Sequence, residues 1–168
     1  MALPSMLVNT NAFLKDTDFV GLANSATLPK IATKTVDMTL AGYAGDIERD
    51  IGKLEKLESE ITISDYSPVV IGLVGSRDSR NETLTLKGAV DADGTTKAYV
   101  VKMQGFWKGV ELNEWKPEIE ITTKFSIAVT VLTIEVDGVE VMHIDKGNNI
   151  FRVNSVDRNE AIRNALGQ

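Results

Sequence analysis

Alternation of apolar and polar side chains is the feature that most restricts how this chain can fold. Between Glu118 and Val131 the odd positions are mostly apolar and the even positions mostly polar, which is the pattern of a β-strand with one dry and one wet face. The phase then flips, because Leu132, Ile134 and Val136 are apolar. A flip of one residue is what a β-bulge produces. We therefore predict two strands, or one strongly bent strand, with the kink near Val131–Leu132.

Two turns that suit positive φ angles predict antiparallel hairpins. Asp137-Gly138 leads into the alternating run Val139–Ile144, and this dipeptide fits the type I′ turn of a two-residue hairpin. The segment Asp91–Gly94 predicts a second hairpin between Thr83–Val90 and Lys97–Gln104. The other predicted strands are Leu7–Leu14 and Phe19–Ala26, joined as a third hairpin, together with Thr33–Leu40 and Ser59–Ile63.

Two helices have capping residues at their starts. Ser67 is placed to cap a short helix with Pro68 at its first position. A C-terminal helix is predicted to begin at Asp157, where Glu160 completes a capping box. The segment Ala41–Leu57 fits either a helix or a long exposed loop, because glycines interrupt its apolar spacing.

The chain is predicted to be one domain, because no repeat or linker divides its 168 residues. Residues 1–168 are expected to form a mainly β fold: an antiparallel β-sandwich or barrel with a short flanking α-helix and a C-terminal helix. Long alternating strands leave sheet edges that can pair with other copies, so self-association is expected. A monomer with edges blunted by lysines is the alternative.

Composition excludes several kinds of site. The chain has no cysteine, which removes disulfides, thiolate zinc sites and cysteine nucleophiles. Its single histidine, His143, cannot form the usual zinc sites with several histidines, and a structural role is expected for it. The net charge of −6 lacks the cationic field that attracts nucleic acid. With no export signal and no run of about 20 apolar residues, folding in the cytosol is expected.

Two pairs of side chains could take part in catalysis or ligand binding. Glu118 and Glu120 would lie about 6.6–7 Å apart on one strand face, a spacing that overlaps that of glycosidase carboxylates, although half-wet strands carry such charges routinely. Trp107 and Trp115 could stack on a sugar, although packing over a sheet edge is the commoner role. No catalytic residue, metal or cofactor is therefore predicted, and the chain is not expected to be an enzyme. A small carbohydrate-binding β module is the alternative function.

Several segments along the chain resemble a known family. They are Asn11–Leu14, Ser25–Lys30, Ala41–Gly45 and, as the most specific piece, Ile144–Arg158. In these segments the chain resembles the major tail tube proteins of contractile-tailed phages and of R-type pyocins, the phage-tail-like bacteriocins. The likeness runs over nearly the whole length and is weakest in Glu58–Asn113.

The resemblance implies a structural role. Subunits of this family form hexameric rings that stack into a rigid hollow tube, and a contractile sheath drives the tube through a bacterial envelope while it conducts ions or DNA. The implied partners are other copies, sheath subunits, and baseplate, spike and tape-measure proteins. No stable nucleic-acid binding is expected, and a membrane is crossed only by the assembled tube. The implied location is the bacterial cytoplasm during assembly, then a released phage-tail-like particle or a virion tail.

Three sets of residues are predicted to make contacts in such a tube. Residues 41–57 are assigned to an extended loop that reaches the adjacent ring, with an ordinary surface loop as the alternative. This set is Gly42, Tyr43, Asp46, Glu48, Arg49, Asp50 and Lys53. A strand's polar face is assigned to the bore, or else to the sheath side. This set is Glu118, Glu120, Thr122 and Lys124. The C-terminal segment is expected to pack on a neighbour or on its own barrel. This set is Asp157, Arg158, Ile162 and Leu166.

Overall fold

The computed structural model describes residues 2–14, 17–19 and 22–168. Its strands are β1 (Met6–Leu14), β2 (Thr17–Asp18), β3 (Ala23–Thr27), β4 (Thr33–Met38), β5 (Ile47–Leu54), β6 (Leu57–Ile63), β7 (Thr83–Ala92), β8 (Thr95–Leu112), β9 (Thr123–Val136), β10 (Val139–Asp145), β11 (Ile150–Val153) and β12 (Val156–Asp157). Its helices are α1 (Pro68–Ile71), the 3-10 helix η1 (Arg77–Asn81) and α2 (Glu160–Leu166). The fold is mainly β, as the alternation predicts.

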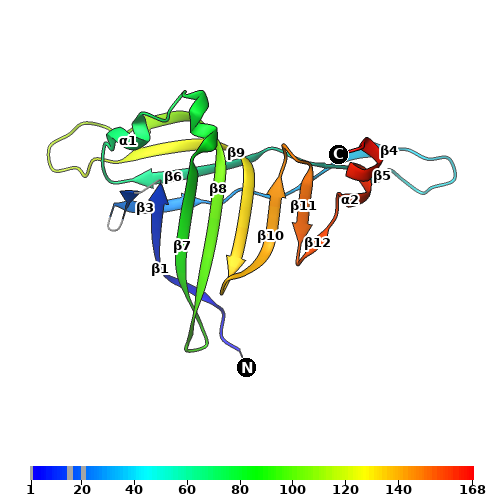
Figure 1. Ribbon diagram of the computed structural model, residues 1–168, viewed down its shortest axis with the longest axis horizontal. Coiled ribbons are helices and arrows are strands. Elements are labelled where there is room, and N and C mark those ends of the chain that lie inside the picture. The colour runs from blue at the N-terminus through cyan, green and yellow to red at the C-terminus, as the bar shows by residue number, and fades with distance from the viewer. Residues whose placement is uncertain (1, 15–16, 20–21) are drawn as a thin grey trace.

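Two layers of antiparallel strands enclose the core. In the main layer, hydrogen-bonded neighbours follow the order β12-β11-β10-β9-β8-β7-β1-β2. The first half of β9 also pairs with β6, which pairs with β3, whereas the second half of β9 pairs with β10. Figure 1 shows β3 and β6 crossing behind β1, β7 and β8. The predicted sandwich is therefore confirmed, with the long strand β9 shared between its layers.

Apolar side chains from both layers fill the space between them. The largest fully buried ones are Trp107, Phe125, Leu14, Leu57, Ile61, Ile63, Leu84, Met103, Ile127, Leu132, Ile144 and Val70. Trp107 meets Phe125 edge to face, with ring centroids 5.6 Å apart, a geometry that adds to the stabilisation from buried area.

The turns and the bulge predicted from local sequence are confirmed. Asp93-Gly94 joins β7 to β8, and Asp137-Gly138 joins β9 to β10, with positive φ at all four residues. Between β8 and β9, Gln104 pairs with Val131 and Gly105 with Val129. Thr130 is therefore the extra residue of a bulge, directly before the predicted kink.

The predicted pairing at the N-terminus is wrong. β1 pairs at Phe13 and Leu14 with the two-residue β2, whereas the predicted turn residues 15–16 lie outside the described part. The longer strand β3 pairs with β6 in the second layer instead of with β1. Alternation predicts that a segment is a strand but not which strand it pairs with, because one dry face can be buried by either layer.

The structure also corrects the predicted starts of the helices. α2 begins at Glu160 and not at Asp157, because Asp157 belongs to β12 and pairs with Arg152 of β11. α1 has the expected Pro68 in its first turn, but its N-cap Ser67 makes no side-chain capping bond. The 3-10 helix η1 was not predicted, although its N-cap Ser76 does accept a hydrogen bond from Asp78 N at 3.3 Å.

Residues 41–57 form neither a helix nor a simple loop. β5 pairs with β4 in a two-stranded sheet of its own. We call residues 33–54, which comprise β4, β5 and their connection, the arm. Figure 1 shows the arm extending from one end of the long axis, beside α2.

Candidate assembly surfaces

The main layer has a polar outer face, which is the side of its strands turned away from the core. A continuous row of cross-strand neighbours lies on this face. The row is Phe13, Thr85, Lys102, Thr133, His143, Arg152 and Asp157. The opposite side of the same strands carries buried residues such as Leu84, Met103 and Leu132. The alternation of each strand therefore gives the sheet one dry and one wet side.

Charges on the outer face compensate one another. Arg152 donates to both carboxylate oxygens of Glu140 at 3.2 and 3.1 Å, and Lys102 lies 3.7 Å from Glu135. His143 shares a hydrogen bond of 2.9 Å with the Thr133 hydroxyl. Its side chain is therefore part of the hydrogen-bonded polar row on this face.

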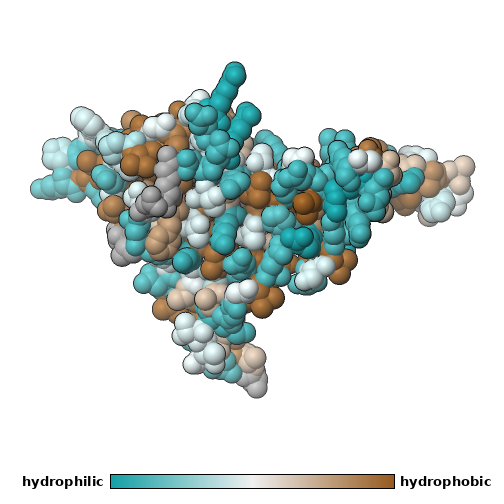
Figure 2. Space-filling view, viewed as in Figure 1, coloured by the Kyte–Doolittle hydropathy of each residue, from teal (hydrophilic) through white to brown (hydrophobic). Residues whose placement is uncertain are grey.

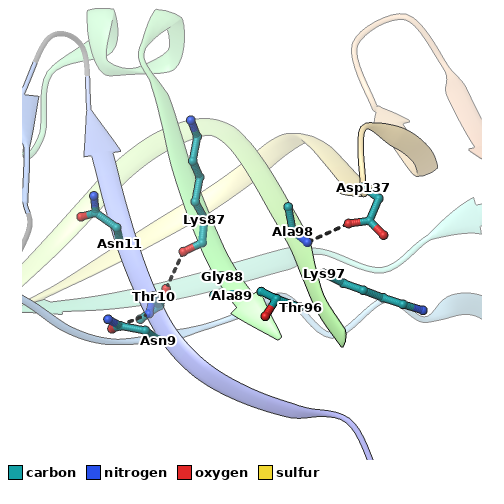
Figure 3. Close-up of a pocket in the computed structure, with 10 residues that line it drawn as sticks. All are labelled: Asn9, Thr10, Asn11, Lys87, Gly88, Ala89, Thr96, Lys97, Ala98 and Asp137. Atoms are coloured by element: carbon teal, nitrogen blue, oxygen red, sulfur yellow. Dashed lines mark hydrogen bonds between the residues drawn. The ribbon is translucent and has the colours of Figure 1, made fainter. Parts of the chain in front are cut away.

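A hollow of about 470 Å³ lies on this face near the β7–β8 turn. Figure 3 shows Asn9, Asn11 and Lys87 on one side of it and Asp137 on the other. The Asp137 carboxylate accepts a hydrogen bond from Ala98 N at 2.8 Å, so it stabilises the β9–β10 turn in which it lies. Over the described residues, no group of three or more His, Cys, Asp or Glu could hold a metal ion.

The second layer has a surface of its own, on the far side from the core. Lys124 lies 3.0 Å from Glu60, and Glu58 is bonded by Lys108 and approached by Lys56 at 3.4 Å. The hydrogen bond from Lys108 holds the pKa of Glu58 below its usual value, and Glu60 raises the pKa of Lys124. Both carboxylates are therefore paired with lysines on this surface.

The predicted strand face at Glu118 is wrong in its first half. β9 begins only at Thr123, so Glu118, Glu120 and Thr122 lie in a loop and share no strand face with Lys124. We call residues 113–122 the Trp115 loop. Glu118 has a φ of +69° and follows Pro117, and the Ile119 N–H donates to Lys116 O at 3.3 Å, which closes a turn with proline at its second position. Pro117 is the signal in the sequence that could have predicted a turn here.

The arm carries the residues predicted for contact between rings. Gly42, Tyr43 and Asp46 lie in the connection between β4 and β5, and the Asp46 carboxylate accepts a bond of 2.6 Å from the Thr39 hydroxyl. The other four, Glu48, Arg49, Asp50 and Lys53, lie on β5. Tyr43 is 62% exposed. The arm thus presents this set at one end of the molecule.

The C-terminal set lies at the base of the arm. A Cβ added to Gly52 would approach Ile162 Cδ1 at 2.9 Å, so α2 packs directly on β5. Asp157 and Arg163 form an ion pair of 2.6 Å that joins β12 to α2. Arg158 and Ile162 line a hollow of about 460 Å³ together with Lys53, whereas Leu166 is exposed. The structure therefore brings together two sets that the sequence predicted separately.

The structure does not support the alternative function of carbohydrate binding. Trp107 is 1% exposed and belongs to the core, whereas Trp115 lies on the surface and stacks on Tyr66 with centroids 6.4 Å apart. The two rings therefore form no common sugar-binding surface. Within the described ranges, no helix has the length and apolarity needed to cross a membrane.

Comparison with known proteins gives one consistent answer. The family model described as phage tail tube protein FII matches residues 4–167. The tail tube protein of Escherichia phage P2 is 32% identical over 171 residues, which cover 99% of each chain. Among solved structures, a chain of an extracellular contractile injection system, the PVC sheath–tube complex in its extended state, has a TM-score of 0.58 at 10% identity, covering 79% of this chain and 91% of that chain. A chain of the anti-feeding prophage cap has a TM-score of 0.55 at 11% identity, covering 75% and 87% of the two chains.

The two structural neighbours are remote in sequence and support the fold alone. The family match and the relative of phage P2 both span almost the full length. Together they identify the chain as a member of the phage tail tube protein FII family.

Proposed function

We propose that copies of this tail tube protein close into hexameric rings that stack as the inner tube of a contractile injection machine, either a phage tail or an R-type pyocin. The observation that carries this proposal is the open main layer. On one side it ends in β1, which the two-residue β2 covers at Phe13 and Leu14, and on the other in β11 with the two-residue β12. Met6, Leu7 and Val8 on the β1 edge are all more than 60% exposed. A contact between two different edges is heterologous, and repeating it closes a ring or builds a filament.

The polar outer face of the main layer is assigned to the bore. Two of its cations are paired with carboxylates, Lys102 with Glu135 and Arg152 with Glu140, which weakens their attraction for phosphates. Ions or DNA could then pass without binding. Lys124 belongs to the second layer, and we assign that surface to the outside of the tube, where sheath subunits bind. Glu118, Glu120 and Thr122 lie in the Trp115 loop, so we no longer assign them to the bore.

The arm is assigned to contacts between rings, and the C-terminal segment to the base that orients it. Ile162 over Gly52 holds α2 against the arm, and the Asp157–Arg163 pair ties α2 to β12. Leu166 remains exposed for a neighbouring copy. Further partners under this proposal are baseplate, spike and tape-measure proteins, and assembly takes place in the bacterial cytoplasm. The protein acts as a structural subunit and not as an enzyme.

Negative-stain electron microscopy of the purified protein tests the proposal. The wild type should form rings or tubes, whereas Val8→Lys should remain monomeric because it places a charge on the β1 edge. Val69→Lys is the matched control, since Val69 is an exposed valine on the helix α1 and not on an edge strand. A wild type that stays monomeric at high concentration, or a Val8→Lys variant that assembles normally, would contradict the proposal.

A further inference from the structure

The Trp115 loop holds apolar side chains in solvent although its backbone is well braced. Trp115 is 81% exposed, Ile119 45% and Ile121 47%. Asn113 fixes the loop from one end, because its side-chain amide donates to Glu120 O at 2.7 Å and its backbone N–H donates to Thr122 O at 3.3 Å. The exposure of these side chains is therefore a feature of an ordered loop.

Trp115 is also held in one orientation. Its indole stacks on Tyr66 with an angle of 20° between the rings, and its Nε1–H donates to the Tyr66 hydroxyl at 2.7 Å. The polar atom of the indole is satisfied within the chain, which leaves apolar ring surface for a partner. A large aromatic ring that is already fixed loses little entropy on binding, as is typical of interface anchors.

Acidic residues flank the apolar side chains of this loop in the sequence. The carboxylates on the loop and directly before it are Glu111, Glu114, Glu118 and Glu120, against the one cation Lys116. A partner should therefore combine apolar side chains with positive charge.

One face of the arm has that combination. Val36 pairs with Arg49 and Met38 with Ile47, and Ile51 lies on the same face as Ile47 because strand side chains alternate. Val36, Ile47 and Ile51 are all exposed. The acidic residues lie on the opposite face, which carries Asp37 across from Glu48 and Thr35 across from Asp50.

We infer that the Trp115 loop of one subunit binds the apolar, basic face of the arm of a second copy. The two surfaces lie at opposite ends of the long axis (Figure 1), so one chain cannot bring its own pair together. Figure 2 shows apolar surface at both of these ends. The inference rests on the proposed function and adds to it the surface that receives the arm.

Disulfide crosslinking provides a direct test, because the chain has no cysteine. Ile119→Cys protein is mixed with Ile47→Cys protein, allowed to assemble and oxidised. A crosslinked dimer should form that neither variant gives alone. Glu48→Cys is the matched control: it is the next residue on β5 but lies on the opposite face. Its yield with Ile119→Cys should be at least about tenfold lower, since a disulfide requires Cβ atoms about 4 Å apart.

A second variant tests the energetic role of the indole. Trp115→Ala should fold normally, by circular dichroism and melting temperature, but need at least about tenfold more protein to assemble, as expected for a hot-spot residue. Trp115→Phe should recover most of this loss. Tubes that form while the Ile47 and Ile119 variants stay uncrosslinked, or crosslink no better than the Glu48 control, overturn the inference and leave the proposed function intact. Absence of tubes from wild-type protein would instead overturn the proposed function.

Discussion

Gly105 lies directly against the backbone of Ala128 where β8 crosses β9. A Cβ atom on Gly105 would stand 2.1 Å from the Ala128 carbonyl oxygen and 2.8 Å from its carbon. The bulge at Thr130 begins at this crossing, since Gly105 pairs with Val129 and Gln104 with Val131. The bend that lets β9 serve two layers thus depends on a residue without a side chain.

Gly105→Ala should therefore destabilise the subunit by about 3 kcal/mol or more, because the obstacle is backbone and cannot move as a side chain can. Urea unfolding of the monomeric protein measures this loss. Gly109→Ala on the same strand is the control, as its Cβ would meet no atom within 4 Å. Equal stabilities of the two variants would show that the strands are not in this close contact.

Trp107→Ala should cost about 3–5 kcal/mol of folding stability, because it empties the centre of the core beside Phe125. Trp115→Ala, the other tryptophan variant, should leave the melting temperature within a few degrees of the wild type. Differential scanning calorimetry distinguishes the two. A large loss at Trp115 would mean that its loop is part of the core.

Asp157→Asn should lower stability at neutral pH. The hydrogen bond from Arg163 holds the pKa of the Asp157 carboxyl below the ordinary value of 3.8. The folded pKa is the lower one, so the stabilisation is complete above about pH 3.8 and is lost as the pH falls through the folded pKa. Melting temperatures of wild type and variant should differ at pH 7 and converge in strong acid. Asp93→Asn, at a turn position that asparagine tolerates, is the control for exchanging a surface carboxylate for an amide.

Backbone amides of the arm should exchange with solvent much faster than those of β8 and β9 in the monomer. The arm is a two-stranded sheet apart from the main layer, and such a ribbon is marginally stable without packing. Hydrogen–deuterium exchange should then show strong protection of residues 33–54 after tube assembly. An arm that is equally protected in the monomer would argue against its role in contacts between copies.

Features encoded within a few residues could be predicted from the sequence. The turns at Asp93-Gly94 and Asp137-Gly138 depend on local φ preferences, and the bulge after β9's first half appears as a shift of alternation. The C-terminal helix was predicted three residues too early at Asp157, because a capping-box pattern cannot show that Asp157 also pairs with Arg152 of β11. The strand predicted from Glu118 begins only at Thr123, because a turn at Lys116–Ile119 and the hydrogen bond from Asn113 to Glu120 O hold the preceding residues in a loop.

The sequence by itself determined that this protein is a mainly β domain with bent strands, because alternation and turn residues act over short distances. Its segments also resembled the tail tube family, and the family match confirms that resemblance. Only the tertiary structure decided which strands pair, that β4 and β5 form an arm, and that α2 lies at its base. Those outcomes depend on contacts between residues far apart in the chain, where several partners could bury the same apolar face and only packing selects among them.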